Sequence, residues 1–318
     1  MTYDKTWGPI ADLDIIKKRA ALLWQIRDFM DRHDILEVDT PILSHSAVTD
    51  PYIQSLQTKH VFEKETLLYM HTSPEYCMKR LLAAESGSIY QIAHVFRDEE
   101  TGKRHQTEFS MLEWYRVGFD YKELMDDVAE LLTEVGLSKP AKMTYADAFL
   151  EIVNINPHTC ELSLLQEISG QHGWGDDSED RHALLDYIFS EVVMKDLNNE
   201  KALFIYDYPE CMAALATIKG SRPRVAERFE LFINGMEIAN GFNELCDANE
   251  QKQRFEKELN DRKRKGLSAA PIDQNFISAL KAGLPKSAGV ALGIDRLLMA
   301  LCGKDDIKDV MTFNLNNN

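Results

Sequence analysis

The chain has 318 residues, a formal net charge of −16 and five cysteines. The cysteines are odd in number and lack CxxC spacing, which argues against a disulfide framework and against a zinc site. The negative charge disfavours a long nucleic-acid track, because phosphate binding depends on clustered Lys and Arg. This length suits one large domain or two small ones, and the lack of a Pro-, Gly- or Ser-rich tract favours one.

Targeting signals are not evident in the sequence. The start, residues 1–14, has no basic region followed by an apolar stretch and does not read as a signal peptide. The most apolar stretch, Val290 to Leu301, is too short to cross a bilayer and contains Asp295 and Arg296. We therefore expect a cytoplasmic protein without a membrane partner.

The first part of the chain predicts helices, short strands and one long-looped hairpin. Apolar side chains recur at helical intervals from Ile15 to His33, and Leu36 to Thr40 then alternate as a strand. Thr72 to Ala84 begins with Thr-Ser-Pro-Glu, which is typical of a helix start. Two strands, Tyr90 to Arg97 and Phe109 to Val117, flank a highly charged connection and predict an antiparallel hairpin.

The rest of the chain predicts further helices and at least one tight hairpin. We expect helices at 120–135, about 158–200 and 295–302, and strands at 202–206, 229–233, 236–239 and 289–294. Asn234-Gly235 between two of these strands is a strong hairpin signal. Antiparallel hairpins mixed with helices predict an α+β fold, with a mostly antiparallel sheet flanked by helices. We expect a single domain, residues 1–318, with a helical insertion at about 158–200.

One face of the second strand of the long-looped hairpin combines apolar and ionisable groups. Alternation places Phe109, Met111, Glu113 and Tyr115 on that face, so a ring, a carboxylate and a phenol project together. A ligand that needs all three explains the pattern. The alternative is an edge strand in which Glu113 forms a salt bridge.

The Asn-Gly hairpin carries two glutamates. A two-residue loop places Phe232 opposite Glu237 and Glu230 opposite Ala239, so the two carboxylates are diagonal neighbours on one face. Diagonal positions are roughly 7 Å apart, which suits a shared hard cation. Magnesium held by these carboxylates and by nucleotide phosphates is one interpretation. Two solvated surface acids are the other.

A phosphate site is suggested at the start of the last predicted helix. Arg296 lies in its first turn, where a cation is disfavoured unless an anion comes to meet it. The sequence contains neither GxxxxGK[ST] nor GxGxxG after a strand, so other groups would have to hold a nucleotide. The alternatives are a surface pairing of Arg296 with a nearby Asp and, for Glu75, a role as a helix-capping acid.

Three segments in order resemble the three signature motifs of class II aminoacyl-tRNA synthetases: Phe29 to Ile42 with Pro41, Phe96 to Tyr115, and Gly289 to Arg296. The lysine-specific branch is the most similar, through Thr72 to Glu75, Glu108 to Tyr115 and Glu237 to Glu244. The likeness covers nearly the whole chain. It implies the fold of the class II catalytic domain and an ATP-dependent enzyme.

The resemblance also implies roles for individual residues. Arg97 would grip the α-phosphate, Phe109 would stack on adenine and Arg296 would bind the γ-phosphate, which makes the two arginines the catalytic residues. The implied ATP-binding residues are Arg97, Asp98, Glu99, His105, Gln106, Phe109, Glu237, Ile238, Gly293 and Arg296. The implied Mg²⁺ ligands are Glu230 and Glu237. The implied substrate-binding residues are Ser73, Glu75, Glu113, Tyr115, Asn240 and Glu244.

One geometric condition accompanies these roles. Simple alternation puts Asn240 and Glu244 on the face opposite Glu237. The roles therefore require a bend or a bulge in this strand, and Gly241 is the obvious place for it.

The position of the first motif in the chain makes the resemblance more specific. A lysyl-tRNA synthetase would carry an OB-type anticodon-binding domain before the catalytic domain, whereas the first motif here begins within ~30 residues of Met1. The chain is similar to the stand-alone paralogues of lysyl-tRNA synthetase that ligate (R)-β-lysine onto a lysine of translation elongation factor P. Ala291, where lysyl-tRNA synthetases usually have Gly, fits a reshaped amino-acid pocket.

The resemblance thus implies an AMP-forming ligase that uses ATP and Mg²⁺, with (R)-β-lysine or lysine as substrate and elongation factor P as acceptor. It also implies a homodimer and makes tRNA a poor acceptor. Two alternatives stay open: a truncated enzyme that charges tRNA or another small acceptor with L-lysine, and an inactive regulatory paralogue. An inactive relative would be expected to lose the phosphate-binding arginines, and both Arg97 and Arg296 are present.

Overall fold

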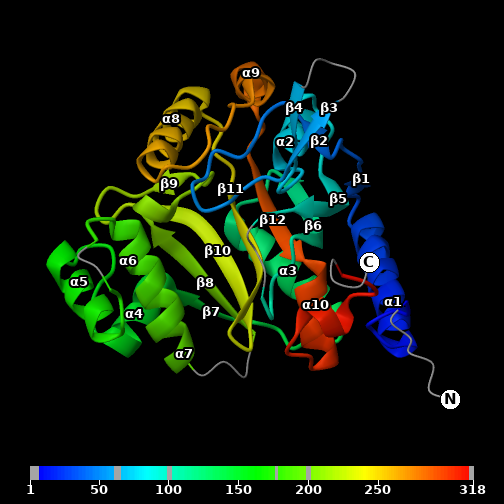
Figure 1. Ribbon diagram of the computed structural model, residues 1–318, viewed down its shortest axis with the longest axis horizontal. Coiled ribbons are helices and arrows are strands. Elements are labelled where there is room, and N and C mark those ends of the chain that lie inside the picture. The colour runs from blue at the N-terminus through cyan, green and yellow to red at the C-terminus, as the bar shows by residue number, and fades with distance from the viewer. Residues whose placement is uncertain (1–6, 61–65, 99–101, 176–177, 198–201, 315–318) are drawn as a thin grey trace. The chain divides into compact units, whose positions relative to one another are not determined.

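The computed structural model describes residues 7–60, 66–98, 102–175, 178–197 and 202–314 (Figure 1). The chain forms two compact units. Unit 1 comprises residues 1–118, 246–285 and 291–318, and unit 2 comprises residues 119–245 and 286–290. None of the helices in the described ranges combines the length and the hydropathy that a membrane crossing requires.

Unit 1 contains the long-looped hairpin. Its strands β5 (Ile89–Phe96) and β6 (Glu108–Val117) pair antiparallel, from Ile89 opposite Tyr115 to Phe96 opposite Glu108. The short strand β1 (Leu36–Glu37) pairs parallel with β5. A separate three-stranded sheet has the order β2 (Leu43–Ser44), β4 (Thr66–Met70) and β3 (Gln57–His60).

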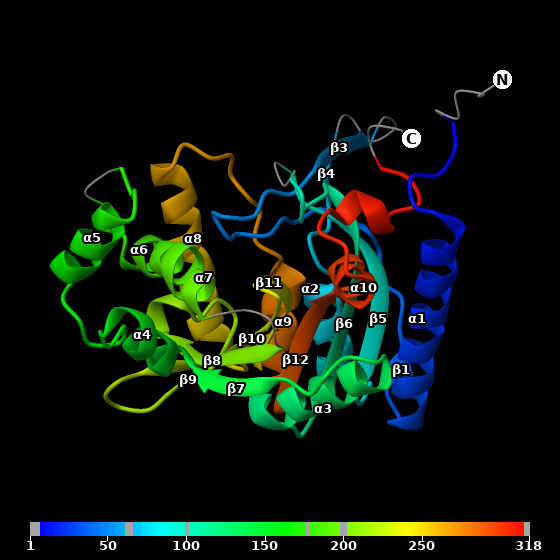
Figure 2. The same ribbon diagram turned by 90° about the horizontal axis from the view of Figure 1, so that it is seen from below.

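Five α-helices of unit 1 matter for the site: α1 (Leu13–Arg32), α2 (Glu75–Ala83), α8 (Ala248–Arg264), α9 (Gln274–Gly283) and α10 (Ile294–Cys302). Asp12 caps α1 by accepting the N–H of Ile15 at 2.9 Å, as expected for a helix start. Helix α1 contacts β1 and α10, and α10 packs on β6 (Figure 2). Helix α9 lies beside both α2 and α8 (Figure 1).

A buried carboxylate fixes α10 in unit 1. Asp295 accepts the backbone N–H of Ser110 at 2.7 Å and an N–H of Arg19 at 2.6 Å. Because Ser110 lies on β6 and Arg19 on α1, this one side chain ties the first turn of α10 to both elements. Arg296 follows directly, so its backbone position is set by the same contacts.

Unit 2 contains the tight hairpin. Its strands are β7 (Ala141–Thr144), β8 (Leu203–Pro209), β9 (Ile218–Lys219), β10 (Val225–Ile233) and β11 (Met236–Asn243). They pair in the order β11, β10, β8 and β7, and β9 also pairs with β10. Only the pairing of β7 with β8 among these is parallel. Strand β12 (Ser287–Gly293) begins in unit 2, and its last residues belong to unit 1.

Helices cover an aromatic core in unit 2. The helices that contribute to it are α4 (Tyr145–Val153), α5 (Leu162–Gln171), α6 (Arg181–Ile188) and α7 (Met194–Asp196), with a π-helical turn at Phe189–Val193. Unit 2 also contains α3 (Tyr121–Glu134). Rings of Tyr145, Phe149 and Phe189 stack with centroids 4.8 Å apart in the two pairs formed by Tyr145. Leu165, Leu184 and other side chains of the 162–196 region complete this core. These helices therefore stabilise unit 2 through apolar burial.

The prediction of an α+β fold with a mostly antiparallel sheet is confirmed. The strand predicted from Leu36 to Thr40 is shorter than expected and ends at Glu37, although Val38 still donates its N–H to the carbonyl of Tyr90 at 2.8 Å. The prediction of a single domain with a helical insertion at about 158–200 stays a prediction.

Candidate active site

A polar cluster in unit 1 joins four of the predicted substrate-binding residues. Glu113 lies in the middle of β6, is 2% exposed and accepts two short hydrogen bonds. Ser73 donates to its Oε2 and Tyr115 donates to its Oε1, each at 2.6 Å. The hydroxyl of Ser73 also accepts the N–H of Glu75 at 3.0 Å, at the start of α2. Glu113, on the predicted face of β6, is therefore linked through Ser73 to the start of α2.

Lys79 was not among the predicted site residues, but it belongs to the same cluster. Its Nζ lies 2.6 Å from Oε1 of Glu75, one helical turn earlier, and the residue is 1% exposed. The cluster thus contains two acids and one base. A Glu–Lys pair four residues apart on a predicted helix was the available signal, since such pairs meet on the helix surface.

The neighbours of Glu113 in this cluster have opposing effects on its pKa. Burial raises the pKa of Glu113 to about 7, and the neighbouring Glu75 adds to the increase. Hydrogen bonds from Ser73 and Tyr115 and the charge of Lys79 lower the pKa and oppose this effect. A buried carboxylate in such surroundings gains when a further cation arrives. Two hydroxyl groups donate to Glu113, in place of the salt bridge that was the alternative for this residue.

The predicted phosphate-binding arginines also lie in unit 1. The guanidinium carbon of Arg97 stands 5.2 Å from the ring centroid of Phe109, as in a cation–π contact. Phe109 and Ala291 both pack against a small apolar cluster of Ala93, Val95 and Met111. The backbone N–H of Arg97 donates to the carbonyl of Thr107 at 2.9 Å and extends the hairpin by one further bond.

Arg296 and the hairpin connection meet within unit 1. Arg296 donates its Nε–H to the backbone carbonyl of Arg104 at 3.1 Å. Gly293 is the N-cap residue of α10 and provides no side-chain cap. The neighbouring Asp295 is buried and paired with Arg19, so it is not a surface partner for Arg296. Of the other predicted nucleotide-binding residues, Gln106 is buried, His105 forms a backbone bridge with Gly102, and Glu99 lies outside the described residues.

The tight hairpin in unit 2 has a different register from the predicted one. Phe232 lies opposite Glu237 as expected, but Glu230 lies opposite Asn240, so the predicted pairing with Ala239 is wrong. A bulge causes the difference, because Leu231 pairs with Ala239 and Phe232 with Glu237, which leaves Ile238 as an extra residue. The prediction that β11 contains a bulge is confirmed, whereas its placement at Gly241 is wrong.

This bulge decides which side chains share a face. One residue added to β11 moves Asn240 onto the face of Glu230 and Glu237, and alternation then brings Glu244 to the same side. Gly241 has another role: a Cβ there would lie 2.6 Å from the ring of Phe229 and 2.8 Å from the carbonyl oxygen of Gly289. Only glycine permits this close approach. Glu244 is buried, and its N–H donates to the carbonyl of Ser287 at 3.0 Å.

Arg228 was also not among the predicted site residues. It contacts two of the side chains on this face. Its guanidinium donates to Oε1 of Glu230 at 2.5 Å and to Oδ1 of Asn240 at 3.2 Å. It lies 4.8 Å from the ring centroid of Tyr208, whose hydroxyl donates to Oε2 of Glu230 at 2.7 Å. The available signal was strand alternation, which places residues two apart on one face.

These residues can accommodate a magnesium ion only together with another ligand. Burial raises the pKa of Glu230 to about 7, Arg228 opposes this increase and Glu237 adds to it, which places the two acids near each other. Both oxygens of Glu230 accept one hydrogen bond and retain a second lone pair. The described part of the chain contains no cluster of three metal-binding side chains. Two carboxylates fit a magnesium ion that nucleotide phosphates also hold.

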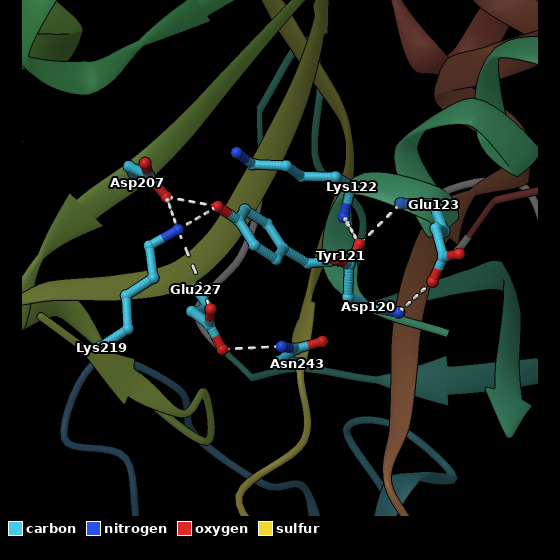
Figure 3. Close-up of polar contacts among 8 residues, drawn as sticks. All are labelled: Asp120, Tyr121, Lys122, Glu123, Asp207, Lys219, Glu227 and Asn243. Atoms are coloured by element: carbon cyan, nitrogen blue, oxygen red, sulfur yellow. Dashed lines mark hydrogen bonds and ion pairs between the residues drawn. The ribbon is translucent and has the colours of Figure 1, made fainter. Parts of the chain in front are cut away.

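A second polar network of unit 2 contains none of the predicted site residues (Figure 3). Tyr121 donates its hydroxyl proton to Asp207 at 2.7 Å, and Lys219 lies 3.0 Å from the same carboxylate and also contacts the Tyr121 hydroxyl. Asn243 donates to Glu227 at 2.6 Å. Lys219 also lies 3.8 Å from Glu227, so this network connects β9 with β10.

Comparisons with known proteins agree with these features. The family model for class II tRNA synthetases (D, K and N) matches residues 12–317. A protein of Haemophilus influenzae (strain PittGG), named elongation factor P–(R)-β-lysine ligase, is 44% identical, and the alignment covers all of both chains. Proteins of the same name are 46% identical in Vibrio atlanticus (strain LGP32) and 45% identical in Vibrio cholerae (strain ATCC 39315), with 97% and 96% of this chain aligned and 98% and 97% of theirs.

The match to the family model includes the hairpin of β5 and β6, the hairpin of β10 and β11, and the β12–α10 segment. The chain therefore belongs to the family of class II tRNA synthetases (D, K and N).

Proposed function

We propose that this protein activates (R)-β-lysine with ATP as the aminoacyl-adenylate and transfers it to a lysine side chain of translation elongation factor P. In the first step the substrate carboxylate attacks the α-phosphorus and pyrophosphate leaves. In the second step a lysine ε-amine of the acceptor attacks the carbonyl carbon of the mixed anhydride, and AMP leaves. The acceptor supplies the nucleophile, so the chain contributes positioning and electrostatic stabilisation.

The observation that carries this proposal is the hydrogen-bonded cluster of Ser73, Glu75, Glu113 and Tyr115 in unit 1. A cationic amino acid needs a buried anion with directed neighbours, and Glu113 with its two hydroxyl donors meets this need. Lys79 already pairs with Glu75. With two acids and one lysine, the cluster can therefore bind one more ammonium group without becoming net positive.

Charge also supports the remaining roles. Arg97 and Arg296 would bind the phosphates, and Phe109 would stack on the base. Glu230 and Glu237 would hold Mg²⁺, which neutralises phosphate charge when it is bound. Asn240 and Glu244 share the face of these glutamates and would contact the amino acid.

The names of the relatives support the choice of substrate and acceptor. Each of the three is named as a ligase of (R)-β-lysine and elongation factor P, and each aligns over nearly its whole length. We propose on the same basis that the protein acts in the cytoplasm, where translation factors work, and that tRNA is not its acceptor.

We also propose that the protein is a homodimer through α1 and β1. Leu13 and Trp24 on α1 are 68% and 67% exposed, and Leu36 on β1 is also exposed. Large exposed apolar side chains on these elements favour burial in an interface. Sedimentation equilibrium of the purified protein tests this proposal.

The proposed reaction is tested by ATP–pyrophosphate exchange with a panel of lysine isomers. We expect exchange that depends on (R)-β-lysine, followed by a mass increase of elongation factor P by one lysyl residue. Exchange with no lysine isomer would overturn the proposal. Transfer of label to tRNA in place of elongation factor P would instead establish the tRNA-charging alternative.

A variant tests the assigned phosphate contact. Arg296→Ala should lower the exchange rate by about a hundredfold or more, because a charge-assisted contact to the transition state is lost. Arg264→Ala, on the exposed end of α8, is the matched control and should exchange at the normal rate. Circular dichroism verifies that both variants fold. Normal exchange by a folded Arg296→Ala protein would refute the role of Arg296.

A further inference from the structure

A segment of unit 1 without a helix or an extended strand lies against one face of α8. It comprises residues 49–54 and contains a turn at Pro51–Tyr52 and a single bridge residue at its end. Such a segment cannot fix its own position through a hydrogen-bond ladder. Its position therefore depends on the side chains that contact it.

Arg262 makes most of these contacts. It lies near the end of α8, is 4% exposed and donates four hydrogen bonds. Two go to the backbone carbonyls of Asp50, at 2.8 Å, and Ile53, at 3.3 Å, and a third goes to Oε1 of Gln54 at 2.8 Å. The fourth goes to the carbonyl of Ser268 at 3.1 Å. The rigid fork of the guanidinium thus binds three residues of the segment at once.

Glu258 holds the other end of the segment. It lies four residues before Arg262, one helical turn away, so both side chains face the segment from the same side of α8. The hydroxyl of Thr49 donates to Oε2 of Glu258 at 2.5 Å. We call Glu258 and Arg262 the α8 clamp.

The partners of Arg262 are informative. All four of its hydrogen bonds go to neutral oxygens, three carbonyls and one amide. Burial of a charged group costs free energy that neutral partners offset only in part. An apolar side chain here would leave these four acceptors without the donors of Arg262. A buried arginine therefore points to a requirement for a defined loop geometry.

The segment leads directly to a proposed phosphate-binding residue. The carbonyl of Gln54 accepts the N–H of Asp98 at 2.9 Å, and these two residues form an isolated antiparallel bridge. Asp98 follows Arg97. The chain of contacts therefore runs from α8 through Arg262 and Gln54 to the backbone beside Arg97, entirely within unit 1.

We infer that Arg262 is a positioning residue that acts through Gln54 to hold Arg97 in place for the α-phosphate of ATP. This inference rests on the proposed function in its assignment of Arg97. Arg262 itself contacts no substrate. Its effect depends on the 49–54 segment, which transmits the position of α8 to the end of β5.

Kinetics of pyrophosphate exchange test the inference. Arg262→Met should lower kcat/KM for ATP between about tenfold and a hundredfold, since misplacing a substrate-binding group by about 1 Å has effects of this size. The KM for the amino acid should change less than twofold. Arg262→Lys keeps the charge and one donor and should restore part of the loss. Arg264→Met, an exposed residue of the same helix, should behave like the wild type.

A double mutant tests whether Arg262 acts through Gln54. Gln54→Leu removes the side-chain acceptor of Arg262 and should lower kcat/KM for ATP less than Arg262→Met does. If both residues belong to one chain of contacts, the double variant should be no worse than Arg262→Met alone. Multiplicative losses would overturn the proposed route.

Hydrogen–deuterium exchange without any substrate separates this inference from the proposed function. Arg262→Met should speed exchange in peptides that cover 49–54 and Asp98, while the peptides of α1 keep wild-type rates. Unchanged exchange at Asp98, or an unchanged kcat/KM for ATP, would overturn the inference. Faster exchange at Asp98 in a protein that activates no lysine isomer would uphold the clamp and reject the proposed function.

Discussion

Glu113 of unit 1 and Glu230 of unit 2 are both buried in the middle of a strand, and the pKa of each is raised to about 7, mainly by burial. Their direct neighbours differ. Glu113 accepts hydrogen bonds from two neutral hydroxyls, those of Ser73 and Tyr115. Glu230 accepts one from a hydroxyl, that of Tyr208, and one from the guanidinium of Arg228.

The difference separates two uses of a buried carboxylate. Arg228 pairs with Glu230 within the fold, which stabilises the hairpin and orients the carboxylate, so a magnesium ion there would also need Glu237 and nucleotide phosphates. Glu113 is held by neutral donors and faces a second acid, Glu75, whose own cation is Lys79. It is therefore suited to a cation that comes from outside. Three variants test this contrast.

The largest effect is expected for the internal pair. Arg228→Met leaves the buried Glu230 without its cation, which should lower the free energy of unfolding by about 3–5 kcal/mol. Urea denaturation measures the loss. Arg224→Met is the matched control, because Arg224 lies nearby in sequence and pairs with Glu210 in an exposed ion pair 2.9 Å long. Its loss should be at most about 1 kcal/mol. Equal losses in the two variants would contradict the contrast.

The pH dependence of the KM for the amino acid tests whether Glu113 binds the substrate ammonium group. Glu113 must be ionised to bind an ammonium group, and its pKa in the free protein is about 7. The KM for the amino acid should therefore fall about tenfold from about pH 6 to about pH 8. The charged groups that face Glu113 are Glu75 and Lys79. Glu113→Gln should give a higher KM that no longer varies with pH.

The same shift predicts the sign of a stability change. The raised pKa means that the folded protein keeps a proton on Glu113 that the unfolded chain releases between about pH 4.5 and about pH 7. The contribution of Glu113 to stability therefore falls as the pH rises through this window. Glu113→Gln should remove that contribution to the slope of stability against pH, as thermal denaturation of the two proteins without ligand can measure.

The KM measurement also has an outcome that contradicts it. If the KM of the Glu113→Gln variant kept the pH dependence of the wild type, Glu113 would be excluded as the ammonium ligand.

The smallest effect is expected for a hydroxyl neighbour. Tyr115→Phe removes one of the two donors that lower the pKa of Glu113, so the KM for the amino acid near neutral pH should rise. A single hydrogen bond of this kind contributes roughly 0.5–1.5 kcal/mol, which corresponds to about two- to tenfold. Tyr206→Phe, on a strand of unit 2, is the control and should change the KM by less. No change in the KM or in its pH midpoint would argue that Tyr115 does not tune Glu113.

Much of the fold follows from local signals. The apolar spacing of α1, the capping box of α3 and the Asn-Gly turn between β10 and β11 are encoded in neighbouring residues, and the structure agrees with each. The alternation of Glu113 and Tyr115 on β6 also follows from the sequence, because a strand of ten residues without a bulge keeps its period of two.

The register of β10 and β11 could not be predicted in the same way. Residues on either side of Asn234-Gly235 fixed the first two pairs, but the bulge at Ile238 shifted every later pair. Arg262 is a similar case. It lies in a run of four charged residues near the end of α8, yet it is buried against residues more than two hundred positions earlier in the chain.

By itself, the sequence determined the helices, the two hairpins and the set of acids and arginines that suit a cationic amino acid and a nucleotide. These depend on side-chain periodicity, turn chemistry and charge, which act over a few residues. Tertiary structure decided the distant partners: Ser73 for Glu113, Asn240 for Arg228, and the 49–54 segment for Arg262. Such pairings depend on which surfaces the packed elements bring together, and on a one-residue bulge that local preferences do not encode.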